Sequence, residues 1–212
     1  MSFHKIQFLT LLFLFFVNSS FPQFSGSVWG GANSSSFGGN PPKDANYESI
    51  YGFSFGADFG YEITEDVVIC LEPSFEQKGS DIVFGDEEKI LDTVLTYSVR
   101  QNYFGLGLLF RINTERFYVG AGTSFQLLTS ANLEFESTDT DIKDKFLDYD
   151  VVCFFNAGYK IPVGVPTIFI ELRYLQGLIS IYSGNEENAS DIYISNFKST
   201  GLKLLAGVMF PL

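Results

Sequence analysis

Hydrophobic and polar residues alternate strictly over a stretch of eleven positions, from residue 51 to residue 61. The apolar or aromatic positions of this stretch are Tyr51, Phe53, Phe55, Ala57, Phe59 and Tyr61, and small or polar residues separate them. A period of two predicts a β-strand with one apolar face and one polar or crowded face. Similar segments recur along the chain at a length of about ten residues, which suits a tilted strand that crosses a bilayer.

The pattern predicts eight strands, at residues 24–33, 50–62, 67–78, 97–112, 116–128, 148–161, 167–180 and 198–212. Short polar turns alternate with longer segments that we expect to be loops, at residues 34–49, 79–96, 129–147 and 181–197. Pro73 lies inside the third strand, where we expect a bulge. An even number of strands with this alternation predicts an all-β fold, an eight-stranded antiparallel up-and-down transmembrane β-barrel.

The first residues follow a different pattern. His4 and Lys5 precede an apolar run from Leu11 to Val17, and small and polar residues come next. This order is typical of a secretory signal peptide and is too short for a spanning helix. We therefore expect a signal peptide at residues 1–23, cleaved between residues 20 and 25, and a barrel domain at residues 24–212. The alternative is an amphipathic or membrane-anchoring helix.

Each predicted strand divides its residues between two faces. The face opposite the aromatic residues combines glycine with a mixture of charges: Asp58, Glu62, Glu72, Glu76, Lys78, Arg111, Lys160, Glu171, Arg173 and Lys203. We expect these groups to form ion pairs that fill a narrow interior, with Glu72, Glu76, Lys78 and Arg111 on neighbouring strands. A soluble lipocalin-like barrel would reverse the faces, and a solvated exterior so rich in glycine would be unusual.

Composition narrows the possible partners. The formal net charge is -12 and the basic residues form no block, so we expect no nucleic-acid partner. The expected partners are outer-membrane lipid, the barrel-assembly machinery during biogenesis and an envelope protein, and we expect a monomer. Cys70 and Cys153 fall in separate strands, one facing the interior and one facing lipid, which predicts no disulfide between them.

The sequence contains few residues that would predict an enzyme. His4, the only histidine, lies in the expected signal peptide, which excludes hydrolases and proteases that need a histidine base. We therefore expect no catalytic residue, no cofactor and no metal. Acidic residues concentrate in the segments 79–96 and 129–148 and predict solvated loops. Asp139 and Asp141 have alternating spacing that could suit a divalent cation, although no glycine or distal glutamate completes a calcium-loop pattern.

Several short motifs occur in a characteristic order. They are the alternating strand at residues 52–61, the stretch Leu71–Gly79 (LEPSFEQKG), Asn102-Tyr103-Phe104 with Arg111, and Glu171-Leu172-Arg173-Tyr174 followed by Gly177-Leu178. In these residues the chain resembles the PorT-like outer-membrane β-barrel family over nearly all of the expected mature protein. The resemblance implies an eight-stranded barrel in the outer membrane. The carboxyl end departs from the usual assembly signal, because Pro211 and Leu212 follow Phe210.

The function that this sequence predicts is a non-enzymatic integral outer-membrane protein with a filled interior and acidic external loops, in a structural, adhesion or interaction role. A narrow channel or a transporter of a small hydrophobic ligand is the first alternative. An accessory component of a protein-secretion complex is the second, and it depends on the family resemblance alone.

Overall fold

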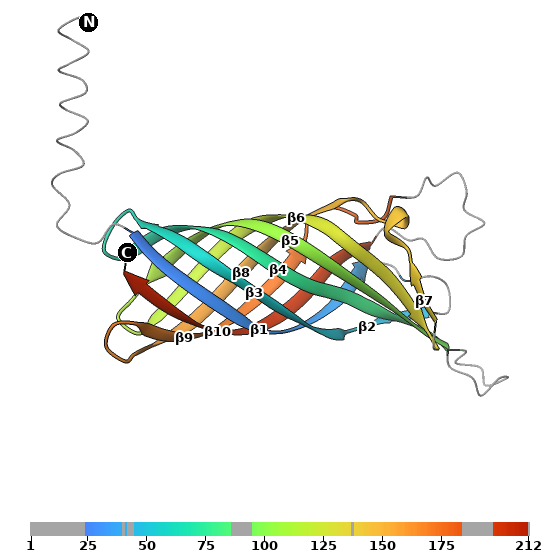
Figure 1. Ribbon diagram of the computed structural model, residues 1–212, viewed down its shortest axis with the longest axis horizontal. Coiled ribbons are helices and arrows are strands. Elements are labelled where there is room, and N and C mark those ends of the chain that lie inside the picture. Colours follow the sequence, from blue (N-terminus) through green and yellow to red (C-terminus); the bar gives the residue numbers. More distant parts are fainter. Residues whose placement is uncertain are drawn as a thin grey trace, which may run out of the picture.

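A closed ring of strands forms the body of the protein. The computed structural model describes residues 24–39, 41, 45–85, 95–136, 138–183 and 197–211. The predicted signal peptide and its cleavage site lie outside these residues. The ring-forming strands are β1 (Phe24–Gly39), β3 (Ile50–Glu62), β4 (Val67–Phe84), β5 (Leu95–Asn113), β6 (Phe117–Phe135), β8 (Tyr149–Pro162), β9 (Thr167–Gly177) and β10 (Phe197–Pro211) (Figure 1).

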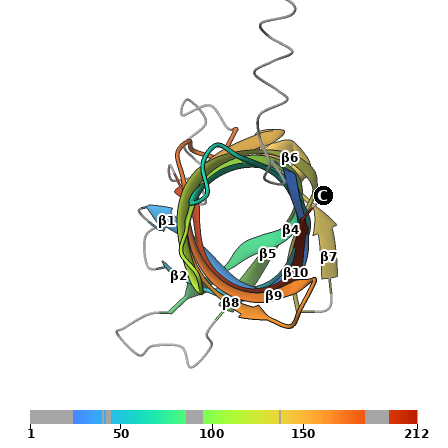
Figure 2. The same ribbon diagram turned by 90° about the vertical axis from the view of Figure 1, so that its left-hand side faces the viewer.

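All pairings in the ring are antiparallel, and neighbours in the ring are neighbours in the chain except at its closure. The order is β1, β3, β4, β5, β6, β8, β9 and β10, and β10 pairs with β1 along fifteen positions from Ser25–Pro211 to Gly39–Phe197. Figure 2 looks along the ring axis and shows the closed wall. The described strands therefore confirm an all-β antiparallel fold in which eight strands form a ring. Among the described residues, no helix is long and apolar enough to cross a membrane.

The strands are longer than the sequence pattern predicts, at the end with the long connections. β4 continues through Phe84 and β6 through Phe135, and two further short strands, β2 (Ala45–Glu48) and β7 (Thr138–Asp141), pair with them. Residues 34–39, 45–48, 79–84, 95–96, 129–135 and 138–141 are thus strand, and the prediction of loops there is wrong. β9 is shorter than predicted and ends at Gly177.

Pro73 does not cause a bulge. The pairing of β4 with β5 runs through Pro73 and Leu106 without a shift, while the pairing of β3 with β4 is interrupted between Gly56–Ser74 and Phe59–Leu71. A proline has no N–H to donate, so a local gap in one ladder replaces the predicted extra residue.

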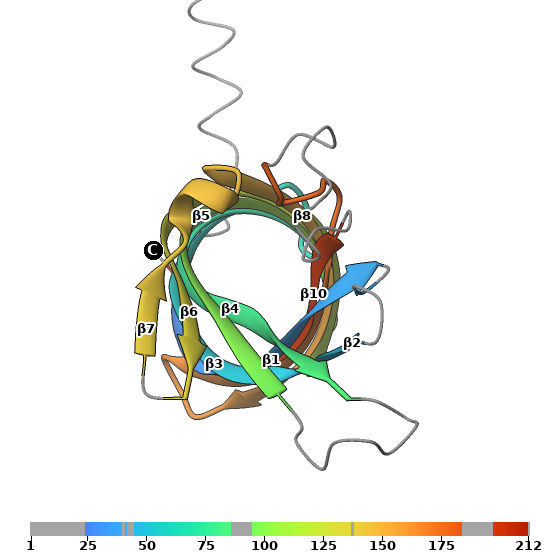
Figure 3. The same ribbon diagram turned by 90° about the vertical axis from the view of Figure 1, so that its right-hand side faces the viewer.

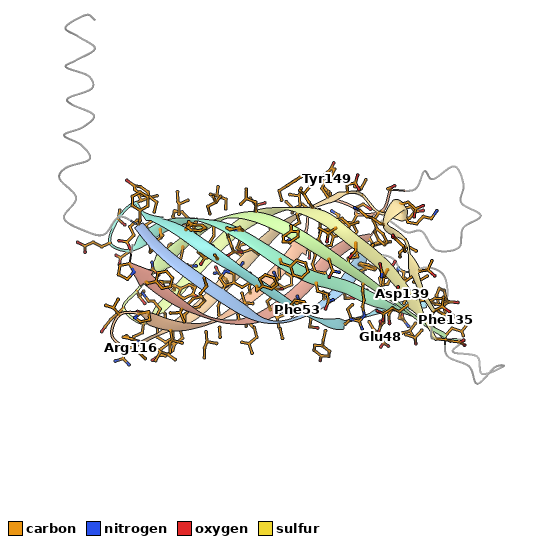
Figure 4. The ribbon with its side chains drawn as sticks, in the orientation of Figure 1. Glu48, Phe53, Arg116, Phe135, Asp139 and Tyr149 are labelled. Atoms are coloured by element: carbon orange, nitrogen blue, oxygen red, sulfur yellow. The ribbon has the colours of Figure 1, made fainter. Side chains whose placement is uncertain are left out.

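Over most of its height the ring has an apolar outer face and a mainly polar inner face. The exposed outer residues include Phe53, Phe55, Phe104, Leu106, Phe155 and Leu204, whereas Asp58, Glu72, Gln126, Asp150 and Arg173 are buried inside. Figure 4 shows the outward side chains, with Phe53 and Tyr149 labelled on the wall. The predicted assignment of faces is correct for these strands.

At the long-connection end the two faces exchange their character. We call this part the extension: β2, residues 79–84 of β4, 95–102 of β5, 128–135 of β6, and β7. Its inner face is mainly apolar, because Val99 and Ala131 are buried and Ile82 and Leu133 pack against the same cluster, although Ser80 and Gln101 are buried on this face too. Its outer face carries polar pairs, among them Arg100 with Glu134 at 3.0 Å. Figure 3 views this end, where β7 lies outside the outline of the ring.

Candidate functional site

The ring encloses the charged residues that the sequence predicts there. Nearly all of the predicted interior charges are less than 6% exposed: Asp58, Glu72, Glu76, Lys78, Arg111, Glu171, Arg173 and Lys203. Lys160 and Glu62 are only half-buried, close to the ends of β8 and β3. The structure therefore confirms the buried set except for these two residues, and Arg173 is the ion-pair partner of Glu171.

Arg173 lies at the centre of this interior. Its two terminal nitrogens donate to the two oxygens of Glu72, with 2.8 Å between Nη2 and Oε2, and its Nε donates to Oε1 of Glu171 at 2.7 Å. The second oxygen of Glu171 accepts hydrogen bonds from Tyr118 Oη at 2.9 Å and Asn156 Nδ2 at 2.6 Å. One guanidinium is thus shared by two carboxylates, and polar neighbours occupy the remaining acceptor sites.

Three further ion pairs occupy other heights of the ring. Arg111 bonds Asp58 at 2.8 Å, Lys78 bonds Asp150 at 3.0 Å and Lys203 bonds Glu76 at 2.5 Å. Asp150 is a buried partner that the sequence analysis did not include among the interior charges. With the Arg173 group, the described interior holds five carboxylates and four cations, so the surplus negative charge belongs to Glu72, Arg173 and Glu171.

Large aromatic side chains share the interior with these charges, which the sequence analysis did not predict. Trp29, Tyr118, Phe154 and Phe169 are all at most 5% exposed, and the Arg173 guanidinium lies 4.5 Å from the centre of the Phe154 ring. Glycine provides the space, since a Cβ on Gly56 would come within 2.6 Å of Trp29 Cζ2. Inward glycine beside an inward aromatic residue on the next strand is the signal that could have found this packing.

An apolar cluster closes the interior at the extension end. It consists of Phe37, Val99, Tyr103, Leu128, Ala131, Phe146, Ile181 and Phe197. The connections between strands supply part of it, because Leu147 N donates to Ile181 O at 2.9 Å and Ile181 N donates to Phe197 O at 3.2 Å. Below the cluster, the space beside Asn33, Lys78 and Lys203 amounts to about 10 Å³, enough for about one water molecule.

The structure also shows the surroundings of the acidic residues and thiols that the sequence analysis considered. The described residues contain no group of three or more His, Cys, Asp or Glu side chains arranged to hold a metal ion. Asp139 accepts a hydrogen bond from Asn132 Nδ2 at 3.0 Å and Asp141 accepts one from Lys143 N at 2.9 Å, so each carboxylate has a partner from the protein. Cys70 is buried, Cys153 is half-buried, and both are free thiols, as predicted.

Acidic residues on the outer face of the extension are paired across strands. Asp81 accepts a hydrogen bond from Ser98 Oγ at 2.5 Å, and Glu134 forms its ion pair with Arg100. Figure 4 shows Glu48 and Asp139 near this end of the molecule. The sequence placed these acids in loops. The structure puts Glu48, Asp81, Glu134 and Asp139 on strands, and residues 86–94 lie outside the described part of the chain.

A closed antiparallel ring with an apolar exterior and an ion-paired interior defines the class of outer-membrane β-barrels. Residues 19–183 match the family described as "Outer membrane protein beta-barrel domain", which is well over half of the chain. The chain belongs to this family and is an outer-membrane protein. The match does not distinguish a PorT-like subgroup.

The chain is similar to several solved structures at low sequence identity. Neisserial surface protein A is 14% identical, with 88% of this chain and 97% of that chain covered and a TM-score of 0.48. Ail, the attachment invasion locus protein of Yersinia pestis, is 18% identical, with 89% and 99% covered and a TM-score of 0.43. OprG of Pseudomonas aeruginosa is 13% identical, with 89% and 96% covered and a TM-score of 0.45. No curated protein sequence matches the chain.

Proposed function

We propose that this protein is a non-enzymatic integral outer-membrane protein, an eight-stranded up-and-down transmembrane β-barrel whose interior is closed and whose extension contacts other envelope components. The apolar outer wall is the surface that lipid would cover, and the extension is the part that would stand in water. In this proposal the chain is a monomer that uses the barrel-assembly machinery during biogenesis.

The observation that carries the proposal is the obstruction of the ring at several successive heights. The Arg173 group links β4 to β9 across the interior, and Lys78 links β4 to β8, so side chains from opposite walls meet at the centre. The cluster around Phe146 and Phe197 covers the extension end. A barrel of this size is just wide enough for side chains to fill, and here the side chains are fixed by ion pairs.

Conductance in planar lipid bilayers tests the closed interior. We expect no steady current from the chain purified in detergent, because the buried ion pairs leave no continuous aqueous path. Arg173→Ala should produce brief openings, since it removes the cation between Glu72 and Glu171. Leu172→Ala, on the outer face of the same strand, is the matched control and should remain silent. A large, steady conductance of the unaltered chain would support the channel alternative instead.

The interaction role is supported by the extension, whereas the alternative of an accessory subunit in a secretion complex depends only on the resemblance to PorT-like barrels. Co-purification in mild detergent separates these roles. A stoichiometric envelope protein would favour an accessory subunit, and a chain that elutes alone would favour a structural or adhesion role.

A further inference from the structure

One strand of the extension ends its sheet with an open edge. In the part of the chain that the structure describes, β7 pairs only with β6, through the register from Asn132–Asp141 to Phe135–Thr138, and all its residues are exposed. Glu136, with a φ of 54°, lies in the tight turn that joins the two strands. An unpaired edge presents N–H and C=O groups that another strand can bond.

The hydrogen-bond pattern shows which groups of β7 are available. Ile142 N donates to Ala131 O at 2.9 Å, which makes this position a bonded pair at the end of the β6–β7 ladder. Bonded and non-bonded pairs alternate along antiparallel strands, so the backbone groups of Thr140 point towards β6. Those of Asp139 and Asp141 therefore point away from the sheet, towards the open edge.

The side chains at this edge select the occupant. Asp139 lies opposite Glu134 and Asp141 opposite Asn132, so both carboxylates are on the outer face of the extension. A second copy of β7 added antiparallel would bring like charges together, which is unfavourable. A strand with basic residues at alternate positions would place each cation opposite a carboxylate while its backbone completes the ladder.

We propose that β7 binds an extended basic segment of a partner protein by strand addition. The segment would have the pattern basic-x-basic, with the two basic residues opposite Asp139 and Asp141 and a β-branched residue opposite Thr140. The proposal deepens the interaction role proposed above and depends on the extension being outside the membrane. Because the open edge is four residues long, the complex is weak and reversible.

Fluorescence anisotropy with a labelled peptide tests the proposal on the chain purified from outer membranes in detergent. The probe is the heptapeptide Thr-Lys-Val-Lys-Val-Lys-Thr, and its Glu-for-Lys counterpart is the control. Asp139→Asn removes one charge and keeps the backbone N–H, whereas Asp139→Pro removes both. We expect affinity to fall about threefold with the first variant and about tenfold with the second. Asp144→Asn, at an exposed acid outside β7, should bind like the unaltered chain.

Backbone N-methylation of the peptide lysines provides an independent check, because it removes the donors and leaves the charges. This peptide should bind at least tenfold more weakly. Equal losses with Asp139→Asn and Asp139→Pro, or an equal loss with Asp144→Asn, would reduce the effect to general charge attraction and overturn the proposal. Absence of peptide binding in a chain that stays non-conducting overturns strand addition alone, whereas a conducting chain contradicts the closed-barrel function.

Discussion

Three strands, β4, β5 and β6, run through both the ring and the extension, and their faces have opposite polarity in the two regions. In the ring the outward residues of a row are apolar, as in Phe75, Phe104 and Leu127, and the inward ones are mainly polar or charged. In the extension the inward residues include Val99 and Leu133, and the outward ones include Arg100 and Glu134. The polarity of the two faces reverses at the row formed by Gln77, Asn102 and Ser130. The pairing register between β5 and β6 shifts at the same place.

In the proposed function, this reversal means that β4, β5 and β6 each pass from lipid into water. A wall in lipid must present apolar side chains outward, so polar groups are kept inside and must be paired there. A sheet in water needs an apolar inner face, and its charges turn outward. The register shift beside Tyr103 allows Leu128 and Ala131 both to face the apolar cluster, which a strict alternation would not permit.

The largest effect should come from breaking the ring interior. Arg173→Ala leaves Glu72 and Glu171 buried without their cation, and we expect the free energy of unfolding to fall by about 3–5 kcal/mol. Urea titration in lipid vesicles measures it, with the fluorescence of Trp29, the single tryptophan, as the probe. Leu172→Ala should cost below about 1 kcal/mol, because lipid tails replace the lost contacts. Similar losses for the two variants would contradict a structural ion-pair network.

The sequence predicted the ring well because the outward positions of its strands follow a simple rule, the one that a wall in lipid would impose. Outward positions must be apolar there, so alternation alone located Phe104, Leu106 and Leu108 and, by contrast, the buried Arg111. In the extension the rule fails, since residues such as Asp81, Ser98 and Glu134 are polar on the face where the ring is apolar. A pattern that reverses in mid-strand resembles a solvated loop, and this explains the wrong boundaries of β4 and β6.

Most charged members of the candidate site were predicted, although Asp150 and the interior aromatic residues were missed, and the pairing was predicted only partly. Facing residues such as Glu72 and Arg173 are 101 positions apart in sequence, and the strands that carry them are not neighbours in the ring. Strand alternation gives the face of a residue but not the height at which it meets a residue from the opposite wall. That height depends on the stagger of the strands and on aromatic residues such as Trp29 and Tyr118, which occupy interior space and contact the charges.

The second largest effect should come from a charge added to the outer face, which should destabilise the ring and not the extension. Leu106→Arg puts a cation on the ring wall and should destabilise the protein by about 2–4 kcal/mol, whereas Thr96→Arg, on the same face of β5 in the extension, should change it by about 0.5 kcal/mol or less. Urea unfolding in vesicles compares them. If Leu106→Arg were tolerated as well as Thr96→Arg, the ring wall would not be the lipid-facing surface.

A smaller and local effect is expected at the rim of the extension. Tyr97 stacks on Phe135 with ring centres 4.4 Å apart, and Phe84 meets Tyr97 edge-on at 5.8 Å. Tyr97→Ala should lower the local stability of the extension by about 1 kcal/mol. Hydrogen exchange should become faster for amides at the extension ends of β5 and β6 and stay unchanged in the ring. Faster exchange throughout the ring would show that the two regions unfold as one unit.

The smallest effect on stability should come from removing one negative charge from the Arg173 group, which has two carboxylates for one cation. Glu72→Gln weakens the bidentate contact with Arg173 but leaves Arg173 paired with Glu171, so we expect a loss within about 1 kcal/mol. Asp58→Asn is the matched control, since it leaves Arg111 without its carboxylate and should cost about 3 kcal/mol. Equal losses in urea unfolding would mean that both Glu72 and Glu171 are needed to balance Arg173. A clearly smaller loss for Glu72→Gln than for Asp58→Asn would show that the interior tolerates the loss of one negative charge. The ring would then require that each buried cation keeps a carboxylate partner, and would not require all five carboxylates.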